Sequence, residues 1–431
     1  MRTALKLAVT SGLMFAALAC SGGDGVNAPT ADFDQVKSSK QRLPADADSG
    51  SVHTLTRNNT EFALALLGEA KPTGNYFTSP HSISTALAMA YAGAAGSTKS
   101  EMQTALHFVQ PDAELHAAFN TLDQKLESRG KGASGSDGKP FRLRVSNAAW
   151  AQSGYPFLPS YLDVLAQNYG AGINLLDFIS DADDCRKTIN KWVAIETEDK
   201  IPELLGPGTV NGDTRLVLTN TVYFNASWAT PFEPKQTKNA AFTRLDGSSV
   251  SVPFMEQRAD HRYAKGAGYE AVELQYDGEE VSMLLLLPDA GTFGQFEQSL
   301  DAQALGDVSA ALNSDYEVSL KLPKFELRTK LSLSSVLSNL GMPTAFTPAA
   351  DFSAMDGSGG LSIQDVIHEA FVKVNEAGTE AAAATAVTMG VTSVPETVSV
   401  TVDRPFLFVI RDNETKANVF LGRITDPSSS E

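Results

Sequence analysis

The sequence predicts an α+β fold in which helices pack on a large, mostly antiparallel sheet. Apolar residues recur at helical spacing through much of the first half of the chain, whereas strand-like runs dominate the second half. Helices followed by strands are typical of α+β domains. With 431 residues and 42% hydrophobic content, the chain can bury a large core. A chain of this length often divides into two or three domains, and one large mixed domain is the alternative.

Six segments show the apolar spacing of amphipathic helices. Ser79, Ser97 and Pro159 stand near the expected starts of three of them, where such residues are favoured. The expected helices cover residues 54–69, 82–92, 99–108, 112–129, 159–169 and 182–198.

Eight further segments carry the alternating or continuous apolar runs of strands. Most of them follow the last expected helix, and no internal repeat is visible. The expected strands cover residues 142–150, 214–224, 250–254, 269–276, 281–287, 316–327, 365–375 and, in pieces, 398–424.

The N-terminus reads as an export signal over residues 1–19. Arg2 and Lys6 precede an apolar run over residues 7–19, which is too short to span a bilayer. Cys20 then resembles the lipidated cysteine of bacterial lipoproteins, which predicts a lipid anchor in the cell envelope. The preceding Ala-Leu-Ala is also an ordinary signal-peptidase site, so secretion of a soluble protein is the alternative.

Residues 20–50 are rich in Ser, Gly, Ala, Asp and Pro, which predicts a flexible tether. The other cysteine, Cys185, has no partner for a disulfide framework and is expected to be a buried small side chain. The formal charge of −17 argues against nucleic acid or anionic lipid as a partner, because both require basic patches.

Catalytic and metal-binding motifs are missing from the sequence. Six histidines are scattered without metal-ligand spacing, and His368-Glu369 lacks the second histidine of a zinc protease helix. The nucleophile motif Gly-x-Ser-x-Gly does not occur, and the glycines of residues 357–360 have no lysine that would make a phosphate loop. We therefore expect no enzyme, no cofactor and no metal.

Residues 376–392, EAGTEAAAATAVTMGVT, form the most informative stretch. Gly378 breaks a helix at the start of the alanine run, and Thr385, Val387, Thr388 and Gly390 disfavour a helix beyond it. Alternate residues instead form a small-to-apolar face, as in a strand. Small side chains would let such a segment slide between two existing strands. A short alanine-rich surface helix or linker is the alternative.

Five motifs in order give the chain a resemblance to the serpin family over residues 51–427. Their order and spacing both match, which makes a chance match improbable. The motifs are NYFTSPHSIS from Asn75, LTNTVYFNASW from Leu218 followed by Pro231-Phe232, LPKF from Leu322, HEAFVKVNE from His368, and DRPFLF from Asp403 followed by FLGRI from Phe420.

The resemblance implies the serpin fold: helices on a large central sheet, further sheets, and an exposed reactive-centre loop over about residues 377–397. In such proteins a protease cuts this loop, and the cut loop inserts into the central sheet as an extra strand. The expected organisation is therefore a serpin domain over residues 51–427 and a short tail over residues 428–431.

The resemblance also assigns a hinge at the start of the loop. Gly378 would let the backbone swing at the end of the preceding strand. Inhibitory members carry small residues here, whereas non-inhibitory members often carry charged, bulky or proline residues. The expected hinge residues are Glu376, Ala377, Gly378, Thr379, Glu380, Ala381, Ala382, Ala383, Ala384 and Thr385.

Family spacing places the bond cut by the protease between Thr392 and Ser393, and a shift of one or two residues stays open. No Arg, Lys, Phe, Tyr or Trp occurs over residues 377–394. Small and medium side chains fit shallow elastase-like or subtilisin-like pockets. The expected partner is a target serine protease held in a covalent acyl complex, with a cysteine protease as the second class.

Further residues match the positions that control opening of the central sheet. A polar cluster would hold two strands together until insertion parts them, an aromatic side chain would lie under the insertion point, and an ion pair would stand at the base of the loop. These residues are Ser79, Ser82, Asn220 and His368 for the cluster, Trp228 for the aromatic side chain, and Lys324 with Glu376 for the ion pair.

The predicted function is suicide-substrate inhibition by a monomer, with the membrane reached only through a lipid anchor. The helix at residues 112–129 mixes acidic and basic side chains, so glycosaminoglycan activation is not expected. The glycine-rich insert over residues 130–138 is expected only to lengthen a surface connection. A non-inhibitory serpin acting as a carrier, chaperone or envelope binding protein is the alternative.

Overall fold

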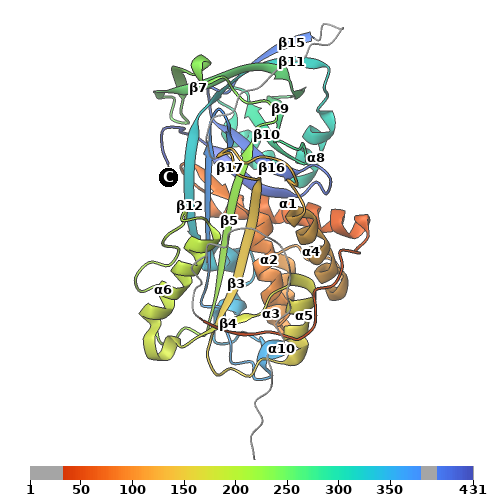
Figure 1. Ribbon diagram of the computed structural model, residues 1–431, viewed down its shortest axis with the longest axis vertical. Coiled ribbons are helices and arrows are strands. Elements are labelled where there is room, and N and C mark those ends of the chain that lie inside the picture. Colours follow the sequence, from red (N-terminus) through yellow and green to blue (C-terminus); the bar gives the residue numbers. More distant parts are fainter. Residues whose placement is uncertain (1–32, 380–395, 431) are drawn as a thin grey trace, which may run out of the picture. The chain divides into compact units, whose positions relative to one another are not determined.

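The computed structural model describes residues 33–379 and 396–430. Within these residues, seventeen strands form three sheets that pack with ten α-helices (Figure 1). The predicted α+β class, with a large and mostly antiparallel sheet, is confirmed.

The largest sheet, here called sheet A, has seven strands in the order β1-β4-β3-β5-β14-β13-β12. Its pairs are antiparallel except β3 with β4 and β5 with β13. Its strands are β1 (Asp34–Val36), β4 (Ile173–Leu176), β3 (Arg142–Gln152), β5 (Leu216–Ser227), β14 (Gly378–Thr379), β13 (Asp365–Val374) and β12 (Phe325–Ser332).

Sheet B has six strands, all paired antiparallel, and sheet C has four. Sheet B contains, in order, β2 (Tyr76–Thr78), β17 (Asn418–Ile424), β16 (Phe406–Asp412), β10 (Val281–Pro288), β9 (Tyr269–Gln275) and β8 (Arg262–Gly266). Sheet C contains β15 (Glu396–Thr401), β11 (Tyr316–Pro323), β7 (Ser249–Asp260) and β6 (Lys238–Thr243).

None of the helices in the described ranges is long and apolar enough to cross a bilayer. The helices are α1 (Ser49–Ala70), α2 (Pro80–Tyr91), α3 (Gly96–Ala105), α4 (Asp112–Glu127), α5 (Pro159–Tyr169), α6 (Phe178–Glu196), α7 (Phe293–Ser299), α8 (Ala302–Ala311), α9 (Ser334–Asn339) and α10 (Ser353–Asp356), with 3₁₀ turns at Pro234–Gln236 and Pro343–Phe346.

Helix α2 lies at the centre of the core, because every one of its residues is buried. It contacts β3 and β5 of sheet A and β17 of sheet B. Beside it, the Phe77 ring stacks on Phe408 and Phe420 of sheet B. Ser79 caps the N-terminus of α2 and accepts from the backbone N–H of Ser82. The N-terminus of α2 thus places the polar side chains of Ser79 and Ser82 beneath sheet A.

The expected strand over residues 316–327 is two strands in two different sheets. Strand β11 ends at Pro323 in sheet C, and β12 begins at Phe325 in sheet A, so Lys324 stands at the corner between them. Pro323 has no backbone donor, and Lys324 still donates its backbone N–H to the Pro253 carbonyl of β7 at 2.9 Å before the chain enters sheet A. Helices α7, α9 and α10 were also not expected, because four to seven residues are too few to show an apolar period. Helix α8 has ten residues and was missed as well.

The tether prediction is wrong for residues 33–50, the part that the structure describes. Strand β1 pairs antiparallel with β4 at the edge of sheet A, where it satisfies backbone groups that an edge strand would otherwise expose. Phe33 packs edge-on against Trp150 at 4.9 Å, and Arg42 pairs with Asp123 and Glu127 of α4. A few anchoring residues outweigh a composition that is otherwise typical of linkers. Residues 20–32 lie outside the described residues.

Candidate functional site

The candidate site is the place where β5 and β13 of sheet A separate. At one end, Val217–Val222 pairs directly and in parallel with Asp365–Ala370, and we call this the closed end. At the other, β14 lies between the two strands, with Thr379 opposite both Ala226 and Val374, and we call this the hinge end. Two residues of the expected hinge therefore already occupy the sheet.

A tight turn delivers the chain from β13 into β14. The N–H groups of Asn375 and Gly378 each donate to the carbonyl of the other residue, at 3.0 and 3.3 Å. Gly378 has φ of 155°, and a Cβ there would lie 2.1 Å from the Ala226 carbonyl oxygen. Only glycine fits this close approach.

Trp228 and Tyr276 form an aromatic platform at the hinge end. Their rings stack at 4.5 Å, and the Trp228 indole N–H donates to the Asn375 carbonyl at 2.9 Å. The Tyr276 hydroxyl is 2.8 Å from Thr379 Oγ1. Burial raises the pKa of Tyr276, so its hydroxyl stays neutral. The expected aromatic residue thus contacts the hinge turn, and Tyr276 joins it without having been singled out.

Lys324 and Glu376 meet as expected at the base of the hinge, with Nζ 2.8 Å from Oε2. Thr237 Oγ1 also donates to Glu376, at 2.7 Å. Burial opposes the charged form of Glu376, but these two hydrogen bonds outweigh it and hold its pKa below the usual value. The pair is half-buried, because Lys324 stands at the corner between two sheets.

The polar residues expected to form a cluster are together at the closed end, and all four are fully buried. His368 Nε2 accepts from the Ser79 backbone N–H at 3.2 Å, so Nδ1 carries the proton and donates to Asn220 Oδ1. The Asn220 amide then donates to Ser82 Oγ. Because His368 lies on β13 and Asn220 on β5, this chain of hydrogen bonds joins the two strands.

Burial lowers the pKa of His368 to about 3, so the imidazole is neutral at physiological pH. The Ser79 hydroxyl donates onward to the Val419 carbonyl at 2.7 Å, which connects the cluster to sheet B. The closed end is thus held by a continuous polar network inside an apolar core.

Asn147 belongs to this cluster and was not predicted. It lies on β3 opposite Asn220, and its Oδ1 accepts from both Asn220 and the Ser82 hydroxyl, the latter at 3.1 Å. An asparagine among Val145, Ala148 and Ala149 in a central strand was the available signal, because a polar side chain there needs a buried partner.

The glycine-rich insert does more than lengthen a surface connection, which corrects that prediction. Ser136 is 1% exposed, and its hydroxyl donates to the Thr379 carbonyl at 2.7 Å. Its backbone N–H donates to Asn225 Oδ1 of β5 at 2.8 Å. The insert therefore touches the hinge itself.

Several predicted site residues lie outside the described residues, and their assignments stay predictions. They are the remaining hinge residues Glu380, Ala381, Ala382, Ala383, Ala384 and Thr385, the expected cleavage residues Thr392 and Ser393, and Cys20.

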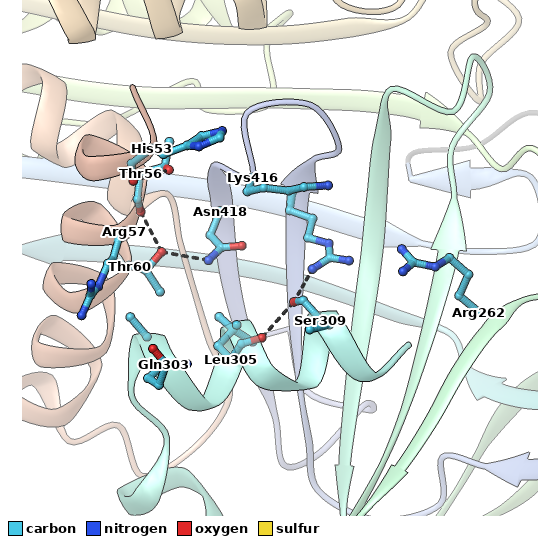
Figure 2. A pocket seen from close by; sticks show the side chains of 14 residues that line it. His53, Thr56, Arg57, Thr60, Arg262, Gln303, Leu305, Ser309, Lys416 and Asn418 are labelled. Atoms are coloured by element: carbon cyan, nitrogen blue, oxygen red, sulfur yellow. Dashed lines mark hydrogen bonds between the residues drawn. The ribbon is translucent and has the colours of Figure 1, made fainter. Parts of the chain in front are cut away.

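A separate pocket of about 480 Å³ lies between α1, α8 and sheet B (Figure 2). Its lining includes the basic side chains of Arg57, Arg262, Arg411 and Lys416 and no carboxylate from the described part of the chain. It shares no lining residue with the hinge or the polar cluster. Buried Glu273 beneath it pairs with Arg262 and Arg411.

The chain matches a known protein family over most of its length. The family model described as serpin (serine protease inhibitor) matches residues 57–427. The leukocyte elastase inhibitors of Homo sapiens and Sus scrofa are each 37% identical over 388 residues, covering 87% of this chain and 100% of the relative.

Solved structures agree in fold. The thermophilic serpin tengpin in its native state has a TM-score of 0.78 at 26% identity, covering 91% of this chain and 97% of its own. Uncleaved ovalbumin has a TM-score of 0.76 at 27% identity, covering 86% and 100%. Human thyroxine-binding globulin in complex with its ligand has a TM-score of 0.78 at 26% identity, covering 88% and 100%.

Proposed function

The chain belongs to the serpin family, and we propose that it traps serine proteases by inserting its cleaved loop into sheet A as an extra strand. The position of β14 carries this proposal, because its two residues already separate β5 from β13. A longer insertion in the same register would find a pairing strand on each side. The relatives named leukocyte elastase inhibitor support inhibition as the activity.

The trapping reaction starts as ordinary acyl transfer. The hydroxyl oxygen of the protease serine attacks the carbonyl carbon of Thr392, and the peptide bond to Ser393 breaks. The hydroxyl proton passes through the protease's own base to the leaving amine, which becomes a new N-terminus at Ser393. If the loop inserts before water hydrolyses the ester, the protease stays attached to Thr392.

Insertion is favourable because it completes backbone hydrogen bonds. A strand of about a dozen residues forms roughly one net bond per residue, each contributing about 0.5 to 1.5 kcal/mol before the cost of ordering the chain. Before that cost the bonds total on the order of 10 kcal/mol, which favours opening of the closed end.

Small side chains around Thr392 support elastase-like and subtilisin-like targets. The stretch over residues 377–394 offers no basic or large aromatic residue for a trypsin-like or large chymotrypsin-like pocket. Shallow pockets that accept Val, Thr or Met fit the residues present.

Purified protein mixed with pancreatic elastase, and separately with subtilisin, tests the proposal. We expect a protease complex that survives a denaturing gel, and a released C-terminal fragment that starts at Ser393 by mass spectrometry. Trypsin serves as the control and should give no complex. Complete cleavage of the loop by both enzymes without any complex would contradict the proposal.

We further propose that the protein is exported and anchored through a lipid on Cys20, because a signal-like segment ends directly before this residue. Mass spectrometry of the mature N-terminus distinguishes a diacylated Cys20 from an unmodified one. The unmodified form would support secretion instead of anchoring.

A second candidate function, carriage of a small anionic ligand, is favoured by the basic pocket of Figure 2. Arg57 and Lys416 on its rim are exposed, and Leu305 adds an apolar wall. The fluorescent probe 8-anilinonaphthalene-1-sulfonate tests it. Binding that Arg57→Ala weakens and the distant control Lys131→Ala leaves unchanged would support carriage, and equal binding by both variants would contradict it.

A further inference from the structure

The insert between α4 and β3 is an ordered part of the hinge end. The Ser134 carbonyl accepts from the Ser227 backbone N–H at 3.0 Å, and its own N–H donates to Asp277 at 2.8 Å. At the base of the insert, Arg142 pairs with Asp137 at 2.6 Å. Three anchors therefore fix a segment whose glycine content would allow many conformations.

These anchors place Ser136 over Thr379, the second of the two hinge residues that lie in sheet A. Its hydroxyl donates to the Thr379 carbonyl, and its backbone N–H donates to Asn225 on β5. Ser136 and Thr379 are 243 positions apart in the chain and both are buried. A Cβ on the neighbouring Gly135 would lie 2.6 Å from Asn225 Oδ1, so the insert packs closely against this side chain of β5.

We propose that the insert over residues 130–140 is a clasp that holds Thr379 between β5 and β13 and thereby starts insertion of the cleaved loop. This inference rests on the proposed function. Ser136 is the positioning residue: it touches neither protease nor cut bond and acts through the carbonyl of Thr379.

The direction of the effect follows from the register. Thr379 already stands opposite Ala226 and Val374, in the place where an added antiparallel strand would begin. A hydrogen bond to its carbonyl stabilises this first pair, and the following residues can then add to an existing start instead of nucleating a new one. The clasp therefore favours insertion and does not retard it.

Speed matters because insertion competes with hydrolysis of the acyl-enzyme. When insertion is slower, more ester is hydrolysed, and more inhibitor is consumed for each protease trapped. One buried neutral hydrogen bond corresponds to roughly a fivefold change in the ratio of inserted to withdrawn Thr379.

Ser136→Ala tests the clasp, with Ser134→Ala as the matched control in the same insert. The contacts of Ser134 described above run through its backbone, so its side chain can be shortened without changing them. Melting of each uncut variant first establishes that it folds.

The first measurement is hydrogen exchange by mass spectrometry on uncut protein, and it needs no protease. We expect the peptide that contains residues 375–379 to exchange roughly fivefold faster in Ser136→Ala than in wild type or Ser134→Ala. Equal exchange in all three proteins would overturn the clasp, whatever the outcome with proteases.

The second measurement is the number of inhibitor molecules consumed for each elastase trapped, together with the rate of loop cleavage. Ser136→Ala should raise the consumption severalfold and leave the cleavage rate unchanged, a split that general destabilisation would not produce. Unchanged or lower consumption would overturn the proposal. If wild type itself forms no complex, the proposed function fails, and hydrogen exchange still decides whether Ser136 holds the hinge.

Discussion

The hinge end and the closed end of the same strand pair are held by different means. At the hinge end β5 and β13 are already apart, and Thr379 between them is held by Tyr276 and Ser136. At the closed end the strands pair directly, and hydrogen bonds through His368 and Asn220 reinforce them. In one sheet, the same two strands are thus separated by β14 at one end and paired directly at the other.

This difference places the resistance to insertion at the closed end. A strand that grows from Thr379 must break the backbone ladder and the polar cluster together when it reaches the directly paired residues. Changes at the hinge end should therefore alter how insertion starts, and changes at the closed end should alter how readily it proceeds.

The largest expected effect is at the hinge end. Thr379→Arg would bury an unpaired charge beside Tyr276, at a cost of several kcal/mol, and should block insertion at this position. We expect the protease to cut the loop and leave, so that the complex disappears from denaturing gels. Thr379→Ser keeps the hydroxyl and should still form the complex; a complex formed by Thr379→Arg would refute the role of the hinge end.

The next effect is at the closed end. His368→Ala leaves the Ser79 N–H and Asn220 Oδ1 without this partner and opens a cavity, which should cost about 3 kcal/mol. We expect a lower melting temperature and faster spontaneous loss of inhibitory activity on warming. His53→Ala, at an exposed histidine, is the control. Activity loss as slow as in wild type would mean that the cluster does not hold the strands together.

Acid should weaken the closed end, because His368 is buried there in its neutral form. The pKa of His368 is about 3 in the folded protein and near 6.5 when unfolded, so the unfolded state binds the extra proton as the pH falls below 6.5. Stability is therefore lost between about pH 6.5 and 3, by about 2 kcal/mol at pH 5 from this residue.

Burial also lowers the pKa values of His81, His116 and His261 to about 4, so they add to this acid sensitivity. The contribution of His368 is the difference between the stability that wild type loses on acidification and the stability that His368→Ala loses. Urea unfolding midpoints at pH 7.5 and pH 5 should show the larger acid loss in wild type. An equal loss in both proteins would exclude His368 as a contributor.

The smallest effect is expected for the ion pair at the base of the hinge. Lys324 is 36% exposed, so Lys324→Ala should cost less than about 1 kcal/mol. We expect a slight acceleration of spontaneous inactivation that disappears at high salt. Lys373→Ala breaks an exposed pair of the same 2.8 Å length, with Glu326, and should not change the rate.

Sequence reasoning identified the residues that lie in recognisable motifs. The positions of Ser79, Asn220 and His368 followed from such motifs, and the structure brings all three side chains together. Asn147 and Ser136 were not predicted, because their partners lie in distant parts of the chain and become neighbours only through sheet pairing and the path of the insert.

The N-terminal tether was mispredicted for a related reason. A segment poor in large apolar residues can still be ordered when a free sheet edge accepts three of its residues, as β4 accepts β1. Composition indicates how much apolar surface a segment can bury by itself. It does not indicate the backbone hydrogen bonds that a neighbouring sheet edge can supply.

The melting temperature before and after a single cut near residue 392 tests the central claim most directly. An inserted strand that contributes on the order of 10 kcal/mol should raise the melting temperature of a domain of this size by about 10 °C. We predict that rise for wild type and its absence for Thr379→Arg. A cut wild-type protein that melts at the temperature of the uncut form would contradict the claim that sheet A accepts another strand.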